Sequence, residues 1–108
     1  MAAPLLALLD GTIADVTSPL VRADDLGVVR GDGVFDATLV RLGADGAPHV
    51  RDREAHLDRL ERSAEILQLP APDRAGYQRA IDALVAAWDF DTRPEALIRL
   101  VLTRGPES

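Results

Sequence analysis

The strongest constraint on the fold is a change in the spacing of apolar residues at Asp52. Before this residue, short apolar or β-branched runs alternate with tight turns. After it, apolar side chains recur about every 3.6 residues, the period of an amphipathic helix. A final apolar run over 97–102 has the length of a strand. In one domain of 108 residues, the order strands, two helices, strand predicts an α+β fold, with a mainly antiparallel sheet covered on one face by two helices.

Turn residues divide the first half of the chain into two predicted hairpins. Asp10-Gly11 separates the runs 5–9 and 12–14, and an Asp-Gly pair is typical of a two-residue hairpin turn. The run 33–42 is rich in β-branched and aromatic residues, and a glycine-containing turn leads it to His49-Val50.

The segment between the two hairpins is predicted to cross the surface. It contains Pro19 and the acidic pair Asp24-Asp25, which we expect to stay in solvent. Val28-Val29 is predicted to add a short strand.

Two helices are predicted after Asp52, which we expect to cap the first of them, until Pro70 ends it. Asp73 is expected to cap the second helix. The residues expected on the buried sides of these helices are Leu57, Leu60, Ala64 and Leu67, followed by Tyr77, Ile81, Leu84, Val85 and Trp88.

Composition excludes several kinds of chemistry. All twelve basic residues are arginines and cysteine is absent, so these residues offer no Schiff-base lysine, thiol nucleophile or disulfide. The formal net charge of −6 argues against nucleic acid as a partner, and two histidines are too few to predict a metal site. The apolar run 5–9 has the features of neither a signal peptide nor a membrane span, which predicts a cytoplasmic protein.

One arginine on the first predicted helix has no helical counter-charge. At about 100° per residue, Arg59 lies at the border of the apolar stripe, beside His56, and has no acid three or four positions away. Arg62, on the polar side, has Asp58 and Glu65 at those distances. Arg59 therefore requires an anion from another part of the molecule.

Two partners for Arg59 are open. A carboxylate or a backbone carbonyl across the edge of the core is one, and an anionic ligand is the other, because a guanidinium matches a phosphate well. His56, at the same helix edge, is interpreted as a structural hydrogen-bonding residue. Gly31-Asp32-Gly33 leads into a strand and lacks the third glycine of a dinucleotide-binding motif.

Two segments in this order resemble one known family. Arg30–Asp36 reads RGDGVFD, and Glu54–Ala64 reads EAHLDRLERSA. They resemble the class IV aminotransferases, the fold-type IV pyridoxal 5′-phosphate enzymes, which include branched-chain and D-amino-acid aminotransferases and aminodeoxychorismate lyases. The resemblance runs from about Leu9 to Gly105.

The resemblance implies roles for two residues. It implies that Arg59 binds the cofactor phosphate, and that Phe35 borders the substrate pocket, where a role in the core is the alternative. Most relatives have Glu followed by Thr or Gly after the phenylalanine, whereas this chain has Asp36-Ala37-Thr38, and no polar role is predicted for Asp36.

The resemblance also implies that residues 1–108 are the N-terminal small domain, and that the lysine-bearing catalytic domain is absent from this chain. The chain alone is then expected to be inactive. The complete protein is expected to be a homodimer that eliminates pyruvate from aminodeoxychorismate to give 4-aminobenzoate, a step of folate biosynthesis. A class IV transaminase acting on branched-chain or D-amino acids is one alternative, and an inactive folding or dimerisation module is the other.

Overall fold

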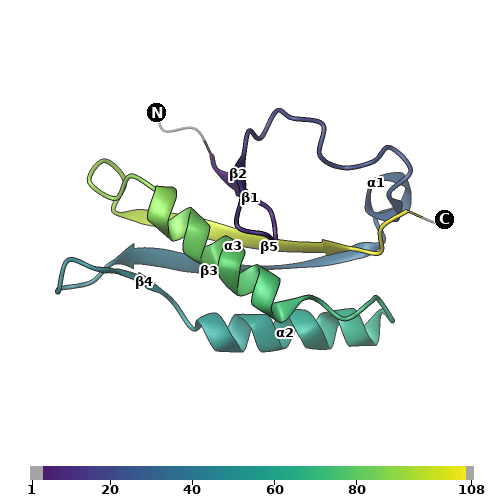
Figure 1. The fold of residues 1–108 in the computed structure, drawn as a ribbon. Helices are drawn as coiled ribbons and strands as arrows, with labels where there is room; N and C mark the ends of the chain where they lie inside the picture. Colours follow the sequence, from purple (N-terminus) through teal and green to yellow (C-terminus); the bar gives the residue numbers. More distant parts are fainter. Residues whose placement is uncertain (1–3, 107–108) are drawn as a thin grey trace.

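The computed structural model describes residues 4–106, and Figure 1 shows two helices lying along one side of a long twisted sheet. The fold is α+β, as the sequence predicts. Its elements in chain order are β1 (Leu6–Ala7), β2 (Ile13–Ala14), α1 (Leu26–Arg30), β3 (Gly33–Leu42), β4 (Pro48–Val50), α2 (Arg53–Ile66), α3 (Arg74–Ala87) and β5 (Glu95–Thr103).

The strands form two antiparallel sheets. β1 and β2 make the predicted first hairpin, which lies next to α3, where the Nε of Arg79 donates to the carbonyl of Leu9 at 3.1 Å. The larger sheet has the order β4-β3-β5, and β3 pairs along nearly its whole length with β5, from Gly33 opposite Thr103 to Arg41 opposite Glu95. The second predicted hairpin is therefore confirmed as β3-β4, and the last predicted strand as β5.

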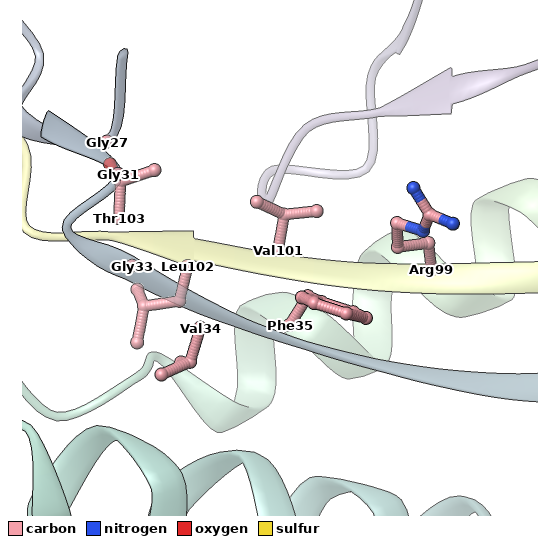
Figure 2. Close-up of a pocket in the computed structure, with 9 residues that line it drawn as sticks. All are labelled: Gly27, Gly31, Gly33, Val34, Phe35, Arg99, Val101, Leu102 and Thr103. Atoms are coloured by element: carbon pink, nitrogen blue, oxygen red, sulfur yellow. The ribbon is translucent and has the colours of Figure 1, made fainter. Parts of the chain in front are cut away.

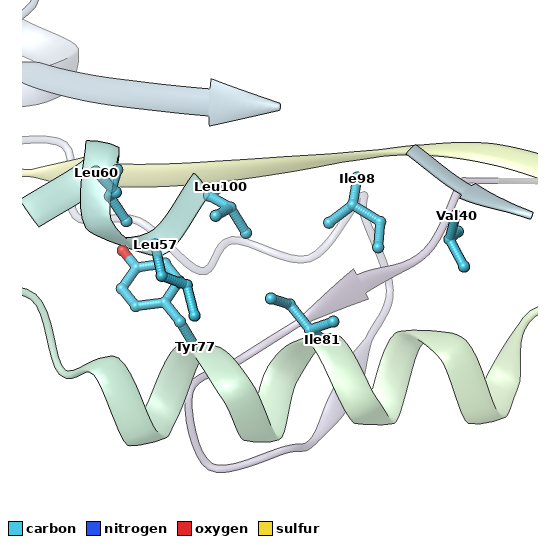
Figure 3. Close-up of a cluster of buried hydrophobic side chains, with 7 residues drawn as sticks. All are labelled: Val40, Leu57, Leu60, Tyr77, Ile81, Ile98 and Leu100. Atoms are coloured by element: carbon cyan, nitrogen blue, oxygen red, sulfur yellow. The ribbon is translucent and has the colours of Figure 1, made fainter. Parts of the chain in front are cut away.

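Alternation along β3 and β5 separates the two faces of this sheet. On β3, Asp36, Thr38 and Val40 are buried beneath the helices, and on β5 the buried residues are Ile98 and Leu100. Figure 3 shows the side chains of the sheet and both helices meeting in one cluster, which consists of Val40, Leu57, Leu60, Tyr77, Ile81, Ile98 and Leu100. On the opposite face, which we call the open face, Phe35, Leu97 and Val101 are exposed within residues 4–106.

The segment before β3 differs from its prediction, because Val28-Val29 lies in the helix α1 and not in a strand. Asp25 caps this helix by accepting from the backbone N–H of Gly27 at 2.8 Å, and Gly31 ends it in the left-handed conformation. Asp25 is itself buried and also accepts from the hydroxyl of Thr103 at 3.0 Å, so the predicted solvation of the Asp24-Asp25 pair is wrong for Asp25.

The ends of the two long helices correct three further expectations. Asp52 precedes α2 as predicted, but it adopts a left-handed conformation and its side chain makes no capping bond. α2 ends at Ile66, which leaves Leu67 exposed. Asp73 caps α3 through the N–H of Gly76 as expected, whereas Trp88 lies just beyond the helix, half-buried, and donates to the carbonyl of Arg93.

A cluster of ion pairs joins α2 to α3. Arg74 on α3 contacts the carboxylates of Glu54, Asp58 and Glu61 on α2. Asp58 is thus engaged by the neighbouring helix, and the predicted pairing of Arg62 with it does not form; within residues 4–106 Arg62 is exposed and makes no ion pair. None of the described helices is long and apolar enough to cross a membrane.

Candidate functional site

Arg59 meets its anion on β3. Its Nε donates to Oδ2 of Asp36 at 2.7 Å, and its Nη2 donates to Oδ1 at 2.6 Å, so the guanidinium and the carboxylate lie edge to edge. His56, three residues earlier on α2, places Nδ1 at 3.1 Å from the same Oδ1. The three side chains form one cluster, which we call the Asp36 cluster.

The Asp36 carboxylate is the buried centre of this cluster. Its side chain is 4% exposed, whereas that of Arg59 is 59% exposed. The backbone N–H of Ala37 adds a further hydrogen bond to Oδ1 at 2.7 Å. Hydrogen bonding from Arg59, helped by the bonds from Ala37 and His56, holds the pKa of Asp36 far below its usual value, although burial acts in the opposite direction.

These contacts identify a partner for Arg59 within the described chain and give Asp36 and His56 polar roles. The carboxylate alternative for Arg59 is confirmed, with Asp36 as the partner across the core edge. Asp36, to which the sequence assigned no polar role, carries the most connected polar side chain on β3, because position 36 faces the helices. His56 makes the structural hydrogen bond predicted for it.

The guanidinium of Arg59 retains donors that face outward. Asp36 uses the Nε edge, which leaves both N–H groups of Nη1 and one of Nη2, and no described residue accepts from Nη1. The exposure of the side chain means that this outer edge is accessible. The cluster therefore fits a phosphate group, which could accept two parallel hydrogen bonds from that edge.

The low pKa of Asp36 predicts an acid-sensitive contribution to stability. A carboxyl whose pKa is depressed in the folded state stabilises the fold fully above its ordinary value, near 3.8, and loses this contribution as the pH falls below it. Asp36→Asn should therefore flatten the pH dependence of unfolding in urea between about pH 5 and pH 2. Asp82→Asn, which removes the charge of an exposed carboxylate paired with Arg53, is the matched control and should keep the wild-type dependence. A steep wild-type slope retained by Asp36→Asn would contradict the assignment.

An open groove of about 270 Å³ lies on the other face of the sheet. It runs between the end of α1 and the adjoining ends of β3 and β5, and Figure 2 shows Arg99 and Val101 projecting from β5 away from the helices. Phe35 lines this groove with 68% of its surface exposed, so the alternative that it belongs to the core is wrong. The guanidinium of Arg99 lies over the Phe35 ring, 5.6 Å from its centroid.

The groove and the Asp36 cluster lie on opposite faces of the same strand. Phe35 and Asp36 are consecutive residues, and successive side chains of a strand point in opposite directions. β4 pairs only with positions 40–42 of β3, so within the described chain the opposite edge of 33–38 is not covered by a strand. A ligand that reached both Arg59 and Phe35 would have to pass this edge.

Sequence reasoning missed two residues of this region. Positions 36 and 40 lie on the same face of β3, because side chains of a strand alternate. The burial of Val40 could therefore have placed Asp36 toward the helices and near Arg59. Arg99 interrupts the apolar run 97–102 and pairs in register with Ala37, which places it on the open face. Within residues 4–106 its guanidinium makes no ion pair.

Comparison with known proteins identifies the family of this chain. Residues 33–108 match the family described as amino-transferase class IV, and the chain belongs to that family.

Two of the similar proteins are much longer than this chain. One is a bifunctional aminodeoxychorismate lyase / D-amino acid transaminase from Mycobacterium tuberculosis, 43% identical over 95% of this chain and 34% of its own length. A chloroplastic D-amino-acid transaminase from Arabidopsis thaliana is 34% identical over 93% of this chain and 25% of its own length. The chain thus spans about a third or less of these relatives.

A solved structure shares the fold. It is a hypothetical aminotransferase from Mycobacterium tuberculosis in a pyridoxal-phosphate-bound form, with a TM-score of 0.82 and 42% identity. The match covers 95% of this chain and 35% of that one. Class IV aminotransferases depend on pyridoxal 5′-phosphate, and the protein of this structure binds it.

Proposed function

We propose that this chain is the N-terminal part of a pyridoxal-phosphate enzyme that acts on amino acids, with aminodeoxychorismate lyase as the leading activity. The observation that carries the proposal is the outward edge of Arg59, a guanidinium fixed on one side and available to an anion on the other. The similarity to the bifunctional Mycobacterium tuberculosis protein supports the lyase, and the same name supports D-amino-acid transamination as the second candidate.

In this proposal the chain supplies binding and orientation. When bound, pyridoxal 5′-phosphate provides an aldehyde for the substrate amine and a conjugated ring that accepts electrons from it. The Nη1 side of Arg59 would hold the phosphate. This chain of 108 residues contains no lysine. A lysine amine able to react with the cofactor aldehyde, and the proton-transferring groups, would therefore come from the remainder of the enzyme.

The groove would contribute to substrate recognition. Phe35 offers an apolar surface, and Arg99 offers a positive charge that no described carboxylate neutralises. A substrate with a carboxylate and an apolar or cyclic body matches this pair chemically. Both candidate substrate classes, aminodeoxychorismate and D-amino acids, have these features.

Exposed apolar residues outside the groove support a homodimer, since exposed apolar surface is typical of an interaction site. They include Leu97 on β5 and Val28 and Val29 on α1. A cytoplasmic location is part of the same proposal.

The complete enzyme should be assayed with each substrate class to test the proposal. The lyase releases pyruvate from aminodeoxychorismate without an amino acceptor, and 4-aminobenzoate appears in equal amount. A transaminase instead needs a keto acid and converts it to an amino acid. Transamination of D-amino acids without pyruvate release would replace the leading candidate by the second, and activity with neither class would contradict the proposal.

A further inference from the structure

The Asp36 cluster contains a residue whose part in ligand binding is indirect. Resting on the proposed function, we propose that Asp36 is a positioning residue, which holds the guanidinium of Arg59 so that its Nη1 side faces the cofactor phosphate. Asp36 itself would not touch the phosphate.

The contacts of the carboxylate carry this inference. Both oxygens of Asp36 are engaged by Arg59, while Ala37 on its own strand and His56 on α2 add bonds to Oδ1. The carboxylate is therefore anchored to β3 and to the helix at once, and it is almost wholly buried. An arginine side chain is long and loses much rotational freedom on binding, so fixing it beforehand favours the bound geometry.

The negative charge of Asp36 could have the opposite effect on phosphate binding, so the direction of the change in affinity tests the inference. Asp36 is negative and already binds Arg59, so it could compete with a phosphate for the same guanidinium. Removing the charge would then strengthen phosphate binding. The geometry favours positioning, because Asp36 occupies Nε and one side of Nη2 and leaves the outer N–H groups to a second acceptor.

The experiment compares pyridoxal 5′-phosphate with pyridoxal, which lacks the phosphate, in the complete enzyme. The dissociation constant of pyridoxal divided by that of pyridoxal 5′-phosphate, both obtained by absorbance titration, measures the phosphate contribution. This ratio is large when the phosphate adds to binding, and its measurement needs no turnover. Asp36→Asn should reduce this ratio about tenfold, the lower end of what is found when a partner of a ligand-binding side chain is removed at metal sites. Asp82→Asn, which removes the charge of the exposed Asp82 carboxylate beside Arg53, is the matched control and should keep the wild-type ratio.

Two further variants separate the failure of this inference from that of the proposed function. Arg59→Ala should reduce the ratio, and adding Asp36→Asn to Arg59→Ala should change it no further, because the two residues act through one contact. If Arg59→Ala lowers the ratio but Asp36→Asn leaves it unchanged or raises it, the inference is overturned and the proposed function stands. If Arg59→Ala leaves the ratio unchanged, the phosphate is held elsewhere, which overturns both the inference and the role of Arg59 in the proposed function.

A measurement on the wild-type enzyme covers the case in which Asp36→Asn does not fold. The hydrogen exchange of the Arg59 Nε–H, followed by nuclear magnetic resonance of the arginine side chains, reports its bond to Asp36. We expect this exchange to stay equally slow when pyridoxal 5′-phosphate binds. Faster exchange in the bound enzyme would mean that the phosphate displaces Asp36, which would overturn the inference.

Discussion

Replacing Arg59 with alanine is expected to weaken the binding of pyridoxal 5′-phosphate to the complete enzyme by about tenfold to hundredfold. A hydrogen bond to a charged group contributes on the order of 1.5 to 3 kcal/mol, which corresponds to that range for one lost contact. The measurement is a titration of the cofactor into the wild-type and variant enzymes.

Arg62→Ala is the control for this prediction. Arg62 lies one turn further along α2, is exposed, and makes no ion pair within the described residues, so its removal should leave cofactor affinity close to that of the wild type. Equal affinities of Arg59→Ala and Arg62→Ala would show that Arg59 only partners Asp36 and that the phosphate is held elsewhere.

A large loss of stability is expected on replacing Ile81 with alanine. This side chain is 1% exposed and lies between α3 and the sheet, within the buried cluster. Ile81→Ala removes buried apolar atoms and leaves a cavity, so the free energy of unfolding should fall by about 2 to 5 kcal/mol. That is a large share of the roughly 5 to 15 kcal/mol of a typical domain. Unfolding in urea, followed by circular dichroism, measures it.

Ile66 offers a control of the same residue type. It stands at the end of α2 with 79% of its surface exposed, and Ile66→Ala should change the free energy of unfolding by about 0.5 kcal/mol or less. Similar losses at Ile81 and Ile66 would contradict the assignment of the core.

The main elements could be predicted because their signals are local and repeated. The period of the helices and the alternation of β3 each extend over many residues, and Asp73 has the local sequence of a capping residue. The five-residue helix α1 offers too few residues for a period, and a pair of valines favours a strand by intrinsic preference. Its signals were the residues at its ends, Asp25 and Gly31.

The site could be predicted only in part. Spacing on a single helix identifies Arg59 as lacking a counter-charge, but it does not identify a partner 23 positions earlier in the sequence. That partner depends on how α2 packs on the sheet. Arg99 depends in the same way on the pairing of β5 with β3, because only the register places it over Phe35.

The position of Phe35 and Asp36 on one strand makes the site depend on the register of that strand. A shift of β3 by a single residue would turn Phe35 toward the helices and Asp36 toward the groove, so a hydrophobic ring and a charged anchor would exchange environments. The turn between β3 and β4, with Gly46 at a φ of 78°, and the long ladder with β5 both oppose such a shift. This turn, remote from either ligand-facing surface, thereby helps the ladder with β5 to determine which side of the sheet presents the aromatic ring and which presents the charged cluster.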